Sequence, residues 1–272
     1  MRDPVAQSNA TQIVQILRSF PQMMLRRTTF PPFIHPRLHR LSDGDRTGLP
    51  EPLANCMSIA HLFASRNAET SPFLWRAIEA EQHRFLQNIE SVEKEELFAA
   101  IQAYIIYLIM RIVDDEAQNV GSGFHMLLSF HKLHDRFRHL CNEVFCEEEQ
   151  WDPSPIWEEW IFAESRRRVA CLWFLIDRVV CVKTGLHCNA SEGFRELSLP
   201  STKFTWDANT QCSWQAEYES CRMMRGTSMS RLGELIDAKQ GDKDSSNARR
   251  LDVWNSGIDT LGTLLNLATA FV

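Results

Sequence analysis

Apolar residues recur with the period of an α-helix along almost the whole 272-residue chain. No segment shows the strict apolar–polar alternation that a half-buried β-strand requires. Ser71 followed by Pro72 is a typical helix start, because a capping residue precedes a proline in the first turn. We therefore predict an all-α fold, a single irregular multi-helix domain of about eight to nine helices that spans residues 1–272.

Prolines, glycines and polar runs divide the expected helices. The first helix should start near Asn9 as its N-cap and be bent or ended by Pro21. Loops are expected at 28–50 and 184–205, where prolines and glycines exclude a long element. The polar stretch 239–250 is expected to be a mobile loop. Helices are expected at about 51–66, from 71 onward, and at 94–113, 119–146, 155–183, 210–222, 227–238 and from 251.

Charge and composition exclude several classes of protein. The net charge is −6, whereas a domain that holds nucleic acid directly is usually basic, so we expect no direct nucleic-acid contact. The eight cysteines contain no CxxC pair, which favours reduced thiols in an intracellular protein. The first residues are polar, so we expect no secretory signal peptide. The most apolar run, 97–113, is about a turn short of a spanning helix. It is typical of a buried core helix, and we expect no membrane contact.

Two short patterns are similar to the Mg²⁺ sites of class I terpene synthases. The acidic cluster "DDEAQ" occupies 114–118, and Asn209, Ser213 and Glu217 lie four residues apart, on one helical face. However, three adjacent acidic residues cannot share one helix face, and no basic residue lies between 204 and 221 to hold a diphosphate. A Mg²⁺-dependent terpenoid enzyme is therefore an alternative rather than the preferred hypothesis.

Other catalytic patterns are weaker still. The segment "HMLLSFHKLHDRFRH", 125–139, has four histidines but no HExxH, and it is typical of an amphipathic helix with partly exposed histidines. No GxSxG elbow, glycine-rich phosphate loop or Cys/His signature occurs. We expect no catalytic residue, no bound cofactor and no metal in this chain, and the protein is not predicted to be an enzyme.

The segment 157–180 is the most informative predicted helix. Its apolar face includes two charged residues, Glu164 and Arg168, in the favourable i, i+4 order for an ion pair. An unpaired buried charge costs several kcal/mol, so the two side chains should pair. Glu164 and Arg168 are either a structural lock or part of a ligand site. Arg166 and Arg167 are expected to point outward, toward solvent or a partner.

The segment "LRSFPQMMLRRTTFPPFIHP", 17–36, runs from a helix end into a proline-rich turn. Apolar residues around Phe20 and Phe33 should bury against neighbouring helices, and the Pro31-Pro32 turn should be rigid. His35 precedes a proline and is therefore biased toward extended backbone. We interpret this segment as a strap that packs across the helices.

Several of these motifs, in this order, resemble the regulatory region (middle homology region) of fungal zinc-cluster transcription factors. The resemblance covers about 8–220 and includes the "PPFIHP" turn, a W-x-x-W-I-x-x-E-S-x-R-R helix and a later Leu-Pro…Trp-x-Ala…Trp segment. As its structural and regulatory motif we single out Pro32, His35, Trp157, Trp160, Glu164, Arg167, Arg168, Trp206 and Trp214.

The resemblance implies a nuclear transcription regulator, with a cytoplasmic pool, that controls a metabolic gene set such as a secondary-metabolite cluster. It implies a small-molecule effector and a homodimer or regulatory protein partner. Full-length members read DNA through a six-cysteine module with two Zn²⁺ ions. No such spacing occurs here, so zinc is expected only if such a module lies upstream. A standalone ligand- or partner-binding module is the other alternative.

Overall fold

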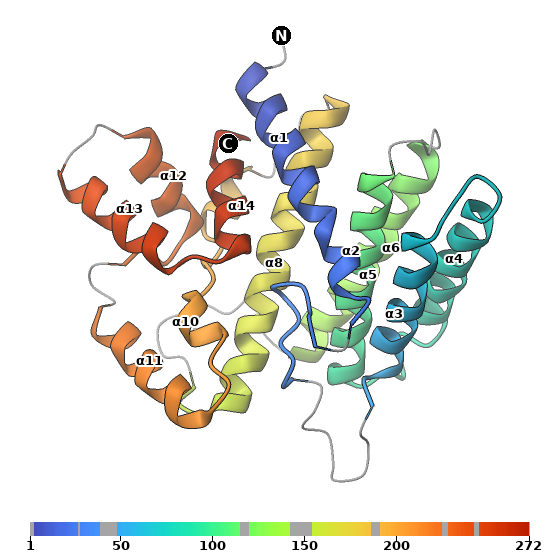
Figure 1. Cartoon of the computed structure of the whole chain (residues 1–272), viewed down its shortest axis with the longest axis horizontal. Coiled ribbons are helices and arrows are strands. Elements are labelled where there is room, and N and C mark those ends of the chain that lie inside the picture. The colour runs from blue at the N-terminus through green and yellow to red at the C-terminus, as the bar shows by residue number, and fades with distance from the viewer. Residues whose placement is uncertain are drawn as a thin grey trace. The chain divides into compact units, whose positions relative to one another are not determined.

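The computed structural model is all-α in the residues that it describes, as predicted (Figure 1). Within these residues the only β-type pairing is an isolated antiparallel bridge between Ser198 and Arg231. The chain divides into two compact units: unit 1 comprises Met1–Ile13 and Cys146–Val272, and unit 2 comprises Val14–Phe145. The described residues are 3–26, 28–38, 48–114, 120–141, 154–185, 191–224, 228–241 and 245–271.

Unit 2 is organised around one apolar helix, α5 (Lys94–Val113), which is buried along nearly its whole length. This helix is long and apolar enough to cross a membrane, but 83% of its most apolar window is buried inside the fold. It therefore serves as a core helix, and α3, α4 and α6 pack against it. The other helices of the unit are α2 (Ser19–Met23), α3 (Glu51–Ala64), α4 (Ser71–Gln87) and α6 (Val120–Cys141).

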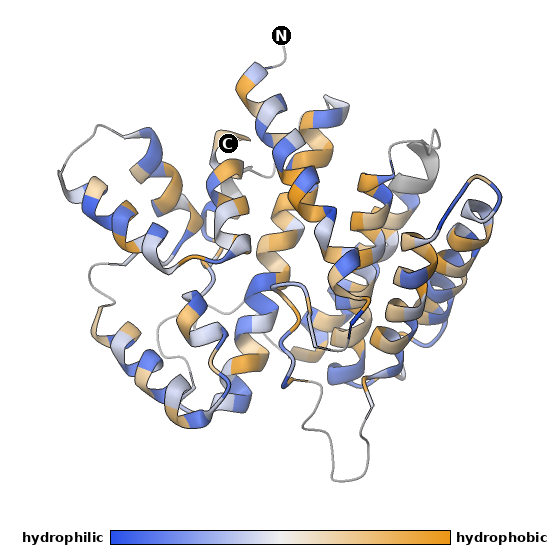
Figure 2. Ribbon diagram, in the orientation of Figure 1, coloured by the Kyte–Doolittle hydropathy of each residue, from blue (hydrophilic) through white to orange (hydrophobic). Residues whose placement is uncertain are grey.

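Unit 1 is organised around the long helix α8 (Trp157–Thr184). A hydrophilic band interrupts the hydrophobic length of this helix in Figure 2. It ends at Gly185, whose φ of 73° lies in the left-handed region that favours glycine. The other helices are α1 (Pro4–Leu17), which continues into unit 2, α9 (Ser191–Arg195), α10 (Lys203–Trp206), α11 (Gln211–Met223), α12 (Leu232–Gln240), α13 (Ser245–Gly257), α14 (Thr260–Ala268) and η1 (Thr269–Phe271).

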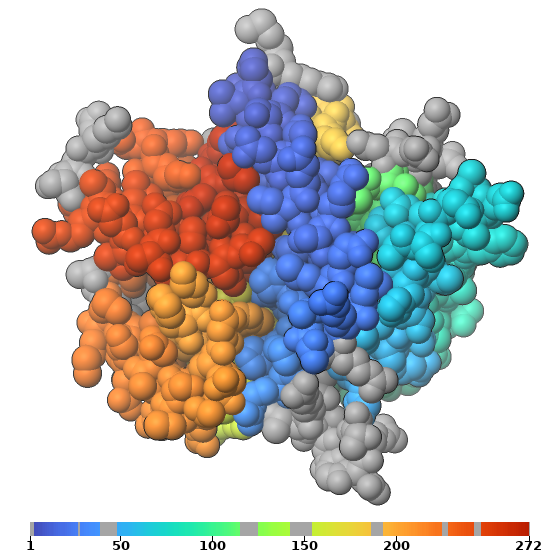
Figure 3. All heavy atoms as spheres, viewed as in Figure 1, coloured from blue at the N-terminus to red at the C-terminus, as the bar shows by residue number. Residues whose placement is uncertain are grey.

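The C-terminal helices of unit 1 form one surface. Atoms of α12, α13 and α14, in red, lie beside those of α10 and α11, in orange, on the face shown in Figure 3. Helix α14 packs directly on α8. The start of α1 is tied to the same region, because Gln7 donates a hydrogen bond to the Val182 carbonyl at 2.8 Å and Asn9 donates one to the Leu267 carbonyl at 3.0 Å.

Helix starts and ends differ from the sequence prediction in several places. Asn9 is not an N-cap, because α1 begins at Pro4, where Asp3 accepts a hydrogen bond from the Val5 amide. Pro21 lies within the short helix α2. These differences, and the short helices, give more elements than the eight to nine expected.

Three further segments also differ. The predicted loop 184–205 contains α9 and α10. The predicted mobile loop 239–250 is largely helical, since α12 ends at Gln240 and α13 begins at Ser245; residues 242–244 lie outside the described part. The single helix expected from 251 is two helices, because Asp259 caps a new one: its side chain accepts a hydrogen bond from the Gly262 amide at 3.1 Å.

Candidate functional site

A buried ion pair lies in the middle of α8, as predicted from the i, i+4 spacing. The Nε atom of Arg168 donates to Oε1 of Glu164 at 2.8 Å, and both side chains are fully buried. Removing two charges from water is costly, and the cost is recovered only when the remaining polar atoms also find partners. The surroundings of this pair therefore decide whether it is stable.

Both members of the pair have further partners, and one of them is the backbone of Ser201. The Ser201 amide donates to Oε1 of Glu164 at 2.8 Å, and the Ser201 carbonyl accepts from Arg168 at 3.2 Å. Arg167 pairs with the other carboxylate oxygen of Glu164. The Arg168 guanidinium lies 4.0 Å from the centre of the Trp206 ring, in a cation–π contact. Glu164 and Arg168 thus fix the backbone at Ser201.

Asp259 completes this network, and the sequence analysis missed it. Its carboxylate pairs with Arg168 and also caps α14 through Gly262. The missed signal was local: Gly257 and the capping residue Asp259 precede an apolar run, which is a typical helix start. The pairing with Arg168 spans 91 residues of sequence, so no local pattern could indicate it.

The electrostatics of the network favour fixed charges. Burial alone would lower the pKa of Arg168, but the carboxylates of Asp259 and Glu164 outweigh it and raise the pKa. Burial raises the pKa of the nearby Cys171 thiol, and Glu164 adds to this effect. The thiol is therefore neutral at physiological pH and donates to the Ser198 carbonyl at 3.4 Å, which is a structural rather than a nucleophilic role.

The segment 197–201, which contains the Leu-Pro motif, is held on two sides. On one side is the network around Ser201. On the other, the Leu199 amide donates to the Ser230 carbonyl and the Leu232 amide donates to the Leu197 carbonyl, each at 2.8 Å. The segment is therefore an ordered connection between α8 and the start of α12.

Three of the predicted tryptophans form an aromatic cluster with Tyr218. The ring of Trp214 stacks on Trp157 with 6.0 Å between ring centres, and it lies 5.7 Å from Trp160 and 4.9 Å from Tyr218. Such pairs contribute beyond their buried area. Trp206 is not a member, because it covers Arg168 instead. The predicted residues of unit 1 therefore form two groups along α8.

A cavity of about 260 Å³ has walls from both groups. Arg166, expected to point outward, is instead buried, with its guanidinium 5.8 Å from the Phe162 ring centre. Arg167, also expected outward, is mostly buried and lines the cavity. Further lining residues are Trp160, Leu199, Pro200, Ser201, Thr202, Thr205, Tyr218, Cys221, Arg222, Met224, Met229, Val253 and Trp254.

Pro32 and His35 belong to unit 2, in the strap. His35 is buried and its Nδ1 atom accepts a hydrogen bond from the Arg37 amide at 3.2 Å, while Pro32 is half-buried. The main anchor is a residue that the sequence analysis missed: Gln102 of α5 donates to the Phe33 carbonyl at 2.9 Å. A glutamine in an apolar helix was its only sequence signal.

Two residues of the terpenoid alternative, Asp114 and Ser213, have other contacts, while Asn209, Ser213 and Glu217 line one pocket together. Asp114 pairs with Arg66 at 3.4 Å in unit 2. In unit 1, the Ser213 hydroxyl accepts a hydrogen bond from the Thr210 amide at 3.3 Å as part of the capping box that starts α11. The rest of the acidic cluster, 115–118, lies outside the described residues. Within the described part of the chain, no group of three or more His, Cys, Asp or Glu side chains could hold a metal ion.

The family is identified by a match to the model of the fungal specific transcription factor domain, over residues 123–267. This match covers more than half of the chain, so the protein belongs to that family. It contains the whole network, from Glu164 to Asp259, and the aromatic cluster. No curated protein and no solved structure matches the chain. The family supports a transcription-regulator-like role and suggests a regulatory rather than a catalytic protein.

Proposed function

We propose that this chain is an effector-responsive regulatory domain, and that its small-molecule effector binds in the cavity of unit 1. The observation that carries the proposal is a shared residue. Ser201 lines the cavity, and its backbone is bonded to both Glu164 and Arg168. A ligand that moved Ser201 would therefore change the contacts of the buried charges.

The chemistry of the cavity supports this role. Most of its exposed wall is apolar or aromatic, as in typical small-molecule sites, and serines, threonines and two arginines supply polar groups. The Ser201 hydroxyl oxygen is buried and makes no hydrogen bond to the described part of the chain. Arg167, held by Glu164, adds a positive charge. These features suit a compact, largely apolar metabolite with an acidic or hydrogen-bonding group.

The test is a variant that fills the cavity. Cys221→Phe places a large side chain on the α11 wall, and it should weaken effector binding at least tenfold. Cys212→Phe is the matched control, because Cys212 is exposed on the same helix. A panel of metabolites is screened by thermal shift, and the hits are measured by calorimetry on both variants. Equal affinities for Cys221→Phe and the unmodified protein would contradict the proposal.

The family supports a wider role that we also propose. We place the protein in the nucleus, with a cytoplasmic pool, as a regulator of a metabolic gene set such as a secondary-metabolite cluster. It would act through its effector and through a homodimer or regulatory protein partner, with DNA contacted by another module. When the chain is fused to a heterologous DNA-binding domain, reporter expression in a fungal host should change with the effector. Reporter expression that never responds to a binding metabolite would contradict it.

A further inference from the structure

Unit 2 buries two glutamines that differ in one respect. The Gln102 side chain is fully buried and donates to the Phe33 carbonyl. The Gln82 side chain, on α4, is only 6% exposed, yet its amide makes no hydrogen bond to any residue that the structure describes. The Gln82 amide atoms are not among the fully enclosed polar atoms that lack a partner, so the small remaining exposure of this side chain includes its amide. The hydrogen bond to Phe33 explains why Gln102 is buried, but no such bond explains the position of Gln82.

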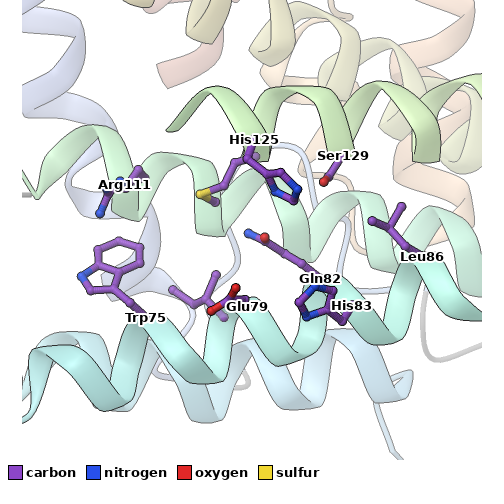
Figure 4. Close-up of a pocket in the computed structure, with 10 residues that line it drawn as sticks. Trp75, Glu79, Gln82, His83, Leu86, Arg111, His125 and Ser129 are labelled. Carbon is purple, nitrogen blue, oxygen red and sulfur yellow. The ribbon is translucent and has the colours of Figure 1, made fainter. Parts of the chain in front are cut away.

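The unpartnered amide faces a cavity. The cavity has a volume of about 340 Å³ and lies between α4, α5 and α6. Figure 4 shows the Gln82 amide pointing into its centre, with Trp75 and Arg111 at one end and Leu86 at the other. The complete lining consists of Trp75, Ile78, Glu79, Gln82, His83, Leu86, Arg111, His125, Met126 and Ser129.

The ends of the cavity differ in chemistry. At one end the Arg111 guanidinium lies 4.9 Å from the centre of the Trp75 ring, which combines a flat aromatic surface with a positive charge. A guanidinium has five N–H donors and can hold a carboxylate alongside another partner. The floor includes the buried side chains of Ile78 and Met126, which are apolar.

Polar groups near the middle limit what can bind. The Glu79 carboxylate lies on the α4 side and disfavours a second negative charge in the ligand. The Gln82 amide supplies both a donor and an acceptor. The buried Ser129 hydroxyl also lines the cavity and interacts with the Tyr104 hydroxyl.

We propose that this cavity binds a small, flat organic monocarboxylic acid. Its carboxylate would pair with Arg111, its apolar body would lie against Trp75 and Met126, and a hydroxyl, carbonyl or amino substituent would bond to Gln82. This site goes beyond the proposed effector cavity, because it lies in the other unit. Most of its lining also precedes residue 123, where the family match begins.

The test uses the full chain and three named probes: 4-hydroxybenzoate, 4-coumarate and indole-3-acetate. Ligand-observed NMR and calorimetry should detect binding of at least one of them, and the matching uncharged amide should bind at least tenfold more weakly. Failure of all three probes to bind at millimolar concentration would overturn the proposal. So would equal binding of the acid and its amide.

Two leucine variants separate binding from stability. Gln82→Leu should weaken binding of the acid at least tenfold while leaving the melting temperature unchanged or higher, because no hydrogen bond is lost. Gln102→Leu is the matched control, and it should lower the melting temperature and keep the affinity. If Gln82→Leu binds the acid normally, or melts as low as Gln102→Leu, the inference is wrong.

A third variant separates this site from the effector cavity. Cys221→Phe, which fills the cavity of unit 1, should leave acid binding unchanged. If it abolished acid binding, the acid would belong to the unit 1 cavity and this inference would be overturned, while the proposed function would stand.

Discussion

The two units bury polar groups in different ways. In unit 1, α8 buries charged side chains. The charges of Glu164, Arg168 and Asp259 compensate one another within one network. In unit 2, α5 is almost entirely apolar, and polar groups are buried singly: Gln102 with a backbone partner, and Gln82 without one. A network of buried charges is stable only when every charged side chain in it is present, whereas single neutral polar groups can be replaced one at a time.

The difference has a consequence for specificity. An apolar helix such as α5 can exchange many side chains of similar volume with a small loss of stability. The network on α8 requires a fork-shaped donor at Arg168, the Ser201 backbone and a helix start at Asp259 in one arrangement. Unit 1 therefore has the stricter geometry, and mutations should affect the two units unequally.

The largest expected effect is that of Arg168→Met. The change removes the cation that Glu164 and Asp259 share, although Glu164 keeps its pair with Arg167, and this should cost about 3–5 kcal/mol of unfolding free energy. Chemical denaturation followed by circular dichroism measures it. Arg195→Met is the control, because Arg195 pairs with Asp237 at the surface, where such pairs contribute about 0–1 kcal/mol. Similar losses in the two variants would refute the role assigned to the network.

A smaller effect is expected for Gln102→Leu in unit 2. The substitution leaves the Phe33 carbonyl without its donor, which should cost about 1–3 kcal/mol. Hydrogen exchange should increase in peptides that cover residues 28–36 of the strap, where the anchor is lost, and stay unchanged in α8. An increase in α8 equal to that in the strap would show that the two units do not respond separately.

Local sequence pattern predicted part of what distinguishes the two units. The 3.6-residue period indicated helices, and the spacing of Glu164 and Arg168 indicated a pair that the structure contains. Asp259 could not be predicted as its partner, because the contact depends on how α14 packs against α8. The short helices α9 and α10 were missed because helices of a few residues have no detectable periodicity.

The two glutamines also show that local sequence pattern does not predict the contacts of a polar side chain. Gln82 and Gln102 both lie in helices and are both buried, and sequence pattern indicated a bonding partner for neither. Only the packing around them shows that one reaches the strap and the other faces a cavity. Sequence therefore predicted most of the longer helices, and three-dimensional packing determined what each of these polar residues does.

The smallest expected effect concerns acid stability and His134, on α6 in unit 2. Burial, followed by the charge of Arg138, lowers the pKa of His134 to about 4, against about 6.5 in an unfolded chain. Between these two values the unfolded chain binds a proton at this position and the folded chain does not. The stability of the folded state should therefore fall as the pH falls from about 6.5 to 4.

The size of this effect follows from the shift. A change of one pKa unit corresponds to about 1.4 kcal/mol, and allowing for the partial exposure of the ring we expect a loss of about 1–3 kcal/mol. Denaturation curves at several pH values should show a flatter profile for His134→Asn, while the control His139→Asn, at an exposed position of the same helix, should keep the original slope. If both variants keep it, His134 is not the group that titrates.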